Sequence, residues 1–235
     1  MTSTITVDTH VADIVIGNPD AARVFERLRI DYCCHGRRPL AEACADAGVV
    51  PDDVIAELAR LDTGPSDMAP TGDIGALIGH IVATHHTFLR RELPRLGDLM
   101  DRVVAAHGSA HPEVHDIAGL LHELTDDLLP HLAKEEQVLF PLAIQLLGAV
   151  GPIEFHFGSV LDPIRVMHAD HDRAGGLLAA LREQTDDYTP PDDACPTWRA
   201  LYAGLADLEA DTHRHVHLEN NVLVPAITEW ELALG

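Results

Sequence analysis

One pattern occurs twice in this chain and constrains its fold more than any other feature. His131 is followed by Glu at +4, Leu at +8 and Pro at +10, and the same spacing returns 84 positions later from His215. Residues four apart on an α-helix differ by about 40° around its axis, so each His shares a face with its Glu. The pairs are His131 with Glu135 and His215 with Glu219. Two helices that each direct an imidazole and a carboxylate inward predict a metal site between helices.

The region around these pairs has the pattern of long helices. Apolar residues recur with helical spacing, and no segment alternates with a period of two. We predict four helices, over about residues 73–106, 112–148, 163–183 and 197–230, joined by loops at 149–161 and 185–196. Four prolines inside these ranges are expected to kink or bend them: Pro94, Pro130, Pro141 and Pro225. The fold class is therefore all-α, with an up-down four-helix bundle over residues 73–235.

The N-terminal quarter of the chain predicts a separate small helical domain over residues 1–61. Short helices are expected at about 9–16, 19–28, 39–47 and 51–61, with a turn at 31–36. Residues 62–72 are rich in Gly, Pro, Ser and Asp and predict a linker. A unit of about 60 residues has a small core, so we expect it to pack against the bundle or to dimerise.

Charge and cysteine content narrow the class of protein. Sixteen Lys and Arg against 38 Asp and Glu give a net charge of −22, which argues against nucleic acid or an anionic membrane as partner. No signal segment opens the chain, and no apolar run is long enough to span a membrane. Four cysteines, two of them adjacent, do not form a disulfide framework. We expect a cytoplasmic protein with reduced thiols.

The duplication extends to two further histidines. Counting back 45 residues from His131 gives His86, and counting back 44 from His215 gives His171. Each half of the bundle is then a helical hairpin with one His on its first helix and a His–Glu pair on its second. The predicted pseudo-twofold site consists of His86, His131, Glu135, His171, His215 and Glu219. Nearby residues compete for these places: His85, Glu136, His168, His213 and His217, of which His217 is expected to be solvated.

The donor types indicate the metal. Structural zinc prefers tetrahedral sites with thiolates, and Ca²⁺ or Mg²⁺ prefers oxygen. Mixed imidazole and carboxylate donors, enough for two ions, suit iron or manganese. We therefore predict two non-heme iron ions bridged by carboxylates, with a coordination position left open. Asp127 and Asp170 either hydrogen-bond the ligand histidines, line a route to the metals, or belong to the solvated surface.

These motifs resemble a known family. The segments His86–Pro94, His131–Pro141, His171–Gly175 and His215–Leu223 resemble the hemerythrin-like cation-binding domain. Asp31–Gly36, with the sequence DYCCHG, resembles the short domain that heads the iron–sulfur cluster repair di-iron proteins, the RIC or ScdA/YtfE family. Together the two parts cover nearly the whole chain in the family's order. The chain departs from the family in having Pro130 directly before a ligand, and Asp where the family often has Glu at 127 and 170.

The resemblance implies a cytoplasmic, homodimeric di-iron protein that restores iron–sulfur clusters damaged by nitric oxide or oxidants. Its partners are damaged or apo iron–sulfur proteins, and oxygen or nitric oxide is its small ligand. Two other functions use the same ligands, namely oxygen or nitric oxide binding or sensing, and reduction of nitric oxide by a di-iron enzyme. Whether the protein is an enzyme is left open.

The cysteine pair separates these functions, because a simple gas store does not need it. Cys33 and Cys34 are candidates to pass iron or supply electrons, and nearby His35 and two arginines predict that they are partly thiolate. The structural alternative is a packed core contact. Cys44 and Cys195 are expected to be structural.

Overall fold

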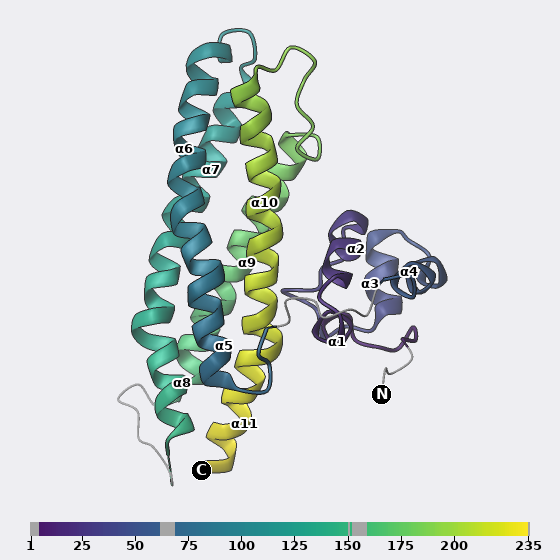
Figure 1. Cartoon of the computed structure of the whole chain (residues 1–235), viewed down its shortest axis with the longest axis vertical. Coiled ribbons are helices and arrows are strands. Elements are labelled where there is room, and N and C mark those ends of the chain that lie inside the picture. The colour runs from purple at the N-terminus through teal and green to yellow at the C-terminus, as the bar shows by residue number, and fades with distance from the viewer. Residues whose placement is uncertain (1–4, 62–68, 150, 152–158, 235) are drawn as a thin grey trace.

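The protein is entirely helical over the residues described by the computed structural model, which are 5–61, 69–149, 151 and 159–234. In these ranges no β-strand forms, and the one β-bridge joins His10 to Pro39. A long bundle stands beside a smaller group of short helices (Figure 1). The predicted all-α fold class, with a helical bundle, is confirmed. No helix of the described ranges is long and apolar enough to cross a membrane.

The bundle has four long helical segments, three of which contain a five-residue π-helical turn. The first segment comprises α5 (Ile74–Ile81), η1 (Val82–His86) and α6 (Thr87–His107). The second comprises α7 (Glu113–Lys134), η2 (Glu135–Leu139) and α8 (Phe140–Leu147). The third is α9 (Leu161–Gln184), and the fourth comprises α10 (Pro196–Leu218), η3 (Glu219–Leu223) and α11 (Val224–Leu234). These bounds agree closely with the four predicted ranges, except that the last helix continues to Leu234.

Local sequence accounts for where two of the helices begin. The Asp73 side chain accepts a hydrogen bond from the Ala76 backbone N–H at 3.0 Å and caps α5. Pro196 occupies the first position of α10, where its missing N–H has no helical partner to lose.

The π-helical turns, rather than the prolines alone, interrupt the α-helical segments. Pro94 and Pro130 lie inside α6 and α7, which continue through them as α-helix. Pro141 and Pro225 instead stand at the second residue of α8 and α11, directly after η2 and η3. Because proline lacks an N–H, it does not donate in the regular α-helical ladder, and a wider turn before it fits this constraint. The irregular turns therefore lie at the predicted metal site.

Two hydrophobic clusters fill the bundle, one on each side of the site. One cluster joins α6, α7, α9 and α10, and includes Leu89, Leu128 and Leu208. The other joins the opposite end, around α5, α8 and the start of α9, and includes Ile81, Leu139 and Leu223. The predicted ligands lie between the two clusters in sequence and in space.

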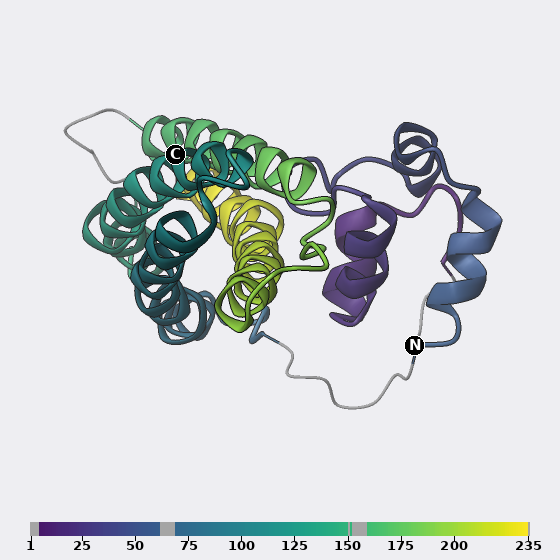
Figure 2. The ribbon, with the colours of Figure 1, turned by 90° about the horizontal axis from the view of Figure 1, so that it is seen from above.

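The N-terminal unit consists of α1 (Val11–Gly17), α2 (Ala21–Leu28), α3 (Leu40–Ala47) and α4 (Pro51–Leu58). It has its own hydrophobic core, to which the bundle contributes Val216. Seen along the bundle, this unit lies beside α9 and α10 (Figure 2). Gly36 lies between α2 and α3, where a Cβ would lie 2.2 Å from the Tyr32 carbonyl oxygen, so only glycine fits. Residues 62–68, most of the predicted linker, lie outside the described residues.

Candidate metal centre

The structure brings the six predicted ligands together inside the bundle. All six are buried, with at most 3% of any of them exposed: His86, His131, Glu135, His171, His215 and Glu219. His86 ends η1, and the two glutamates begin η2 and η3. The three π-helical turns thus each carry one predicted ligand, and His171 comes from the middle of α9. π-Helical turns often occur at functional sites.

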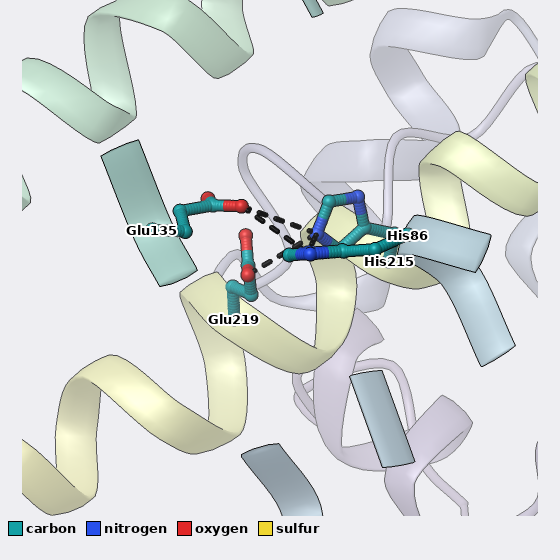
Figure 3. A group of neighbouring side chains, drawn as sticks. All are labelled: His86, Glu135, His215 and Glu219. Atoms are coloured by element: carbon teal, nitrogen blue, oxygen red, sulfur yellow. Dashed lines mark hydrogen bonds and ion pairs between the residues drawn. The ribbon is translucent and has the colours of Figure 1, made fainter. Parts of the chain in front are cut away.

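The six residues form two groups that share both carboxylates. His86 and His215 form the first group with Glu135 and Glu219, and His131 and His171 form the second with the same two glutamates. In each group the potential ligand atoms all lie within 4.8 Å of one another. Figure 3 shows both carboxylates of the first group directed toward the imidazoles of His86 and His215.

Glu135 directs one oxygen to each group. Its Oε1 lies 2.8 Å from His131 Nε2 and 3.7 Å from His171 Nε2. Its Oε2 lies 3.3 Å from His86 Nε2 and 3.7 Å from His215 Nε2. The two ends of one carboxylate therefore face two separate histidine pairs.

Glu219 divides its oxygens in the same way. Its Oε2 lies 3.1 Å from His171 Nε2, and its Oε1 lies 3.1 Å from His215 Nε2. This division matches that of Glu135 and reproduces the pseudo-twofold arrangement expected from the repeat.

Contacts on the outer side fix the orientation of three of the imidazoles. His86 Nδ1 lies 2.7 Å from Glu136 Oε1, and His171 Nδ1 lies 3.0 Å from Asn220 Oδ1. His131 Nδ1 lies 3.4 Å from Asp170 Oδ2. The fourth, His215 Nδ1, is buried and has no hydrogen-bond partner among the described residues. With Nδ1–H donating outward, Nε2 is the nitrogen that carries the lone pair toward the centre.

This arrangement fits a cation between the side chains. In the neutral tautomer the inward nitrogens are acceptors, and they face carboxylate oxygens that are also acceptors. The nitrogens face one another as well, with His86 Nε2 3.2 Å from His215 Nε2 and His131 Nε2 3.1 Å from His171 Nε2. Acceptors this close need either protons or metal ions between them, and buried carboxylates need a compensating charge.

The electrostatics of the glutamates and histidines agree with this requirement. Burial alone raises the pKa of Glu135, but the imidazoles of His131, His171 and His86, when protonated, hold it well below its usual range. Burial lowers the pKa of His171, but the neighbouring Glu135 and Glu219 raise it to about 10. The carboxylates therefore stay ionised and attract positive charge, which a divalent ion supplies as well as a proton does.

The two predicted outer acids have different positions. Asp170 contacts His131 and also accepts a hydrogen bond from Lys134 Nζ at 2.9 Å. Asp127 contacts no ligand and pairs with Arg173, whose Nε lies 2.6 Å from its Oδ2. Both acids line a cavity of about 110 Å³ that reaches His131. Asp170 is thus an orienting acceptor, and Asp127 lines the approach to the site.

Two further residues beside the ligands were not predicted in these roles. Glu136, considered only as a rival of Glu135, instead accepts from His86 and from Arg90 at 2.6 Å. Asn220 follows Glu219 directly and holds His171. The sequence does offer Glu136 as an acid one residue from a ligand, but its reach to His86 depends on how two helices face each other.

The rival histidine His85 is occupied elsewhere. Its Nδ1 lies 3.0 Å from Asp211 Oδ1, and its ring stacks on that of His215 with centroids 5.8 Å apart. It packs against the ligand ring without joining either group of potential ligands.

The prediction for His217 was wrong, because this residue is buried at 3% exposure. Its Nδ1 donates to the Tyr32 carbonyl oxygen at 3.1 Å, so the N-terminal turn covers it. The helical period correctly predicted that His217 does not point toward the metal site. It gave no information about the N-terminal unit, which packs on that side of the helix. Burial lowers the pKa of His217 to about 4.

The prediction of partly ionised cysteines was also wrong for Cys33. This thiol is 6% exposed, and its pKa is raised well above the usual value by the hydrogen bond with Cys34 and by burial. The basic residues near Cys33 in sequence pair with other side chains. Arg38 pairs with Asp46, and His35 Nδ1 lies 2.7 Å from Asp31 Oδ2. Cys34 is partly exposed, Cys44 is buried in the N-terminal core, and all four cysteines are free thiols.

Comparison with known proteins adds to this geometry. Residues 77–227 match the hemerythrin HHE cation binding domain, and residues 7–62 match ScdA_N, a domain of unknown function. The chain is 36% identical over 219 residues to the iron-sulfur cluster repair protein YtfE of Enterobacter sp. (strain 638), covering 93% of this chain and 96% of the relative. It is 34% identical over 229 residues to YtfE of Pectobacterium carotovorum (strain PC1), covering 95% and 98%. The chain belongs to the YtfE family of iron-sulfur cluster repair proteins.

The two groups of side chains described above lie in different domains of the family. All six predicted ligands lie within the match to the HHE domain, and Cys33 and Cys34 lie within the ScdA_N match. A cation-binding domain agrees with the buried His and Glu groups, and the chain therefore has a metal site in its bundle.

Proposed function

We propose that this YtfE family member is a di-iron protein that repairs iron–sulfur clusters damaged by nitrosative or oxidative stress. The observation that carries the proposal is the sharing of Glu135 and Glu219 between two groups of two histidines each. One metal site does not need both oxygens of both carboxylates directed at opposite histidine pairs. Two ions, one per group, use every donor.

In this proposal His86 and His215 would hold one ion, His131 and His171 would hold the other, and Glu135 and Glu219 would each offer one oxygen to both. Imidazole and carboxylate donors without thiolate favour iron or manganese over structural zinc. When bound, the two irons supply one-electron redox chemistry and a coordination position for a small ligand. The protein's part is to orient the imidazoles through Glu136, Asp170 and Asn220, and to keep bulk water out with the two flanking cores.

The cavity beside His131 supports oxygen or nitric oxide as the small ligand. Its volume of about 110 Å³ is sufficient for a diatomic molecule. Lys134 and Arg173 lie on its wall among the acids, so the opening is polar.

Repair, rather than gas storage alone, is favoured by the seating of the N-terminal unit. The unit's Tyr32–Cys33 backbone is hydrogen-bonded to Asn220 and Asn221, beside the ligand Glu219. A gas store requires only the bundle, whereas repair requires contact with damaged or apo iron–sulfur proteins. We further propose, on family membership, that the protein acts as a homodimer in the cytoplasm; light scattering of the purified protein and cell fractionation test these two points.

A repair assay tests the function. A nitrosylated iron–sulfur dehydratase is incubated anaerobically with the iron-loaded protein, and recovery of its activity is followed. The wild-type chain and the Glu123→Gln variant, which changes an exposed acid on α7, are expected to restore activity. The Glu135→Leu variant is expected to lose both its iron and the repair. Full repair by this variant would separate the function from the metal site and refute the proposal.

A further inference from the structure

A second group of side chains that could hold a metal ion lies outside the bundle, in the turn between α2 and α3: Asp31, Cys33 and Cys34. Asp31 Oδ1 accepts hydrogen bonds from the backbone N–H groups of Cys33 and Cys34 at 3.0 and 2.9 Å. Cys33 Sγ lies 3.4 Å from the same oxygen and 3.8 Å from Cys34 Sγ. The carboxylate thus organises a tight turn in which both sulfurs lie beside it.

These separations match those around a single ion. A metal with bonds to sulfur of about 2.3 Å and to oxygen of about 2.1 Å, at tetrahedral angles, holds its sulfurs about 3.8 Å apart and its sulfur and oxygen about 3.6 Å apart. The observed 3.8 Å and 3.4 Å are close to these values, and the ligand atoms of all three residues lie within 4.8 Å of one another. A disulfide, by contrast, requires the sulfurs to approach to about 2.0 Å.

The turn opens into a cavity lined by residues of both the N-terminal unit and the bundle. This cavity has a volume of about 750 Å³ and lies between the N-terminal unit and the bundle. Asp31, Cys33 and Cys34 line one side, and Asp172, Gly175 and Arg182 of α9 line the other. The space is far larger than an ion needs, so it also admits a segment of another protein.

The turn is held on the face of the bundle that carries the iron ligands. Asn220 Nδ2 donates to the Cys33 carbonyl oxygen at 3.3 Å, while Asn220 Oδ1 accepts from the ligand His171. A Cβ at Gly175 would lie 3.8 Å from Cys34 Sγ, so this thiol sits against α9 one turn beyond His171. One asparagine therefore touches both the ligand set of the bundle and the backbone of the cysteine turn.

We propose that Asp31, Cys33 and Cys34 form a separate metal site that holds one iron(II) ion in transit between the bundle and a recipient protein. Binding of the ion releases the two thiol protons to solvent and changes no oxidation state. Three protein ligands leave the fourth position of a tetrahedral ion open for a cysteine thiolate of the recipient, which then replaces this chain's ligands. That the ion is iron on its way to a cluster rests on the proposed function, whereas the existence of the site does not.

Cobalt(II) tests the site directly, because it gives an intense thiolate-to-metal charge-transfer band that histidine and glutamate do not give. The reduced, iron-loaded full-length protein is titrated anaerobically with cobalt(II). One equivalent is expected to bind with this band. The Cys33→Ser/Cys34→Ser variant is expected to lose the band and keep its bundle iron. The Cys195→Ser variant, which changes a cysteine on another element, is expected to keep both.

Two results of the cobalt titration would contradict the proposal. Absence of the band in the reduced wild-type protein, or its persistence in the double variant, shows that these cysteines do not hold the ion. If the double variant loses helical circular dichroism, the single Cys34→Ser change at the partly exposed thiol replaces it, with at least a tenfold weaker cobalt affinity expected and an unchanged affinity counting against the site.

Two variants distinguish failure of the proposed transit role from failure of the proposed di-iron function of the bundle. The Glu219→Leu variant is expected to lose bundle iron yet keep the cobalt band, which shows that the turn is an independent site. Transfer of labelled iron to an apo-cluster protein is expected to slow at least tenfold in the double cysteine variant. An equal transfer rate would refute transit through this site while leaving the di-iron proposal intact.

Discussion

His171 and Asn220 are joined by a hydrogen bond of 3.0 Å between His171 Nδ1 and Asn220 Oδ1, although α9 and η3 bring them from 49 residues apart. The other end of the same amide donates to the Cys33 carbonyl oxygen. Asn220 therefore orients a candidate ligand and anchors the cysteine turn with one side chain. Acceptors of this kind fix the tautomer of a ligand histidine.

Removal of this amide is expected to weaken metal binding. The Asn220→Ala variant leaves His171 without its outer acceptor, and loss of such a contact typically costs about 10- to 100-fold in metal affinity. The matched control is Asn221→Ala, because Asn221 bonds the same turn at Cys33 but contacts no ligand histidine. Iron affinity is measured by competition with a chelator. Equal affinities in the two variants would contradict the assigned role of Asn220.

Glu136 is expected to matter for one of the two ions. Its carboxylate accepts from His86 Nδ1 at 2.7 Å, so Glu136→Gln keeps the shape but removes the charge that polarises this imidazole. We expect affinity at the His86–His215 group to fall about 10- to 100-fold, with the other group less affected. Chelator release should then become biphasic. Release indistinguishable from that of Glu123→Gln, the exposed control on α7, would show that Glu136 has no such role.

Removal of the metal is expected to destabilise the bundle. Without ions, neighbouring histidine protons must compensate the charge of the buried Glu135 and Glu219, and bound ions stabilise the folded state by mass action. At free metal of about 100 times the dissociation constant, the gain in unfolding free energy is about 2.7 kcal/mol. Thermal unfolding of iron-loaded and chelated protein measures this difference. Equal melting temperatures would contradict a structural contribution of the site.

Cys195 is expected to be the most reactive of the four thiols near neutral pH. Hydrogen bonds from the Trp198 backbone and the His107 side chain lower its pKa to about 7, and it is partly exposed at the N-terminus of α10. A lowered pKa keeps the thiolate present above about pH 7 and loses it as the pH falls. Alkylation of Cys195 by iodoacetamide, followed by peptide mass spectrometry, should rise with a midpoint near pH 7. Cys33 and Cys44 are buried and should react far more slowly. Faster labelling of either buried thiol would contradict this prediction.

The sequence predicted the helices and the six candidate ligands because both depend on local periodicity and on an internal repeat. The spacing from His131 to Glu135 alone places the two side chains on one helical face, and the second copy removes most of the ambiguity. The sequence also indicated two of the irregular turns, because Pro141 and Pro225 are the second residues after η2 and η3. The π-helical turn ending at His86 has no proline after it, and no local pattern predicted it.

Residues whose environment depends on another unit were not predictable in this way. His217 is off the metal face by helical phase, yet it is buried because the Tyr32 turn packs on that side. Asn220 acquires its role only when His171 and Cys33 approach it from two different elements. Similarly, the expectation for Cys33 considered charges near in sequence, whereas burial and its contacts with Cys34 and Asp31 determine its pKa.

Iron content of the wild-type and Glu219→Leu proteins, purified anaerobically and checked for retained helical circular dichroism, tests the central claim most directly. Because each glutamate directs one oxygen to each histidine pair, the two ions should depend on the same carboxylate. We predict two irons per chain in the wild-type protein and loss of both in the variant. One iron per chain in the wild-type protein, or one tightly held iron remaining in the variant, would contradict a shared two-metal site.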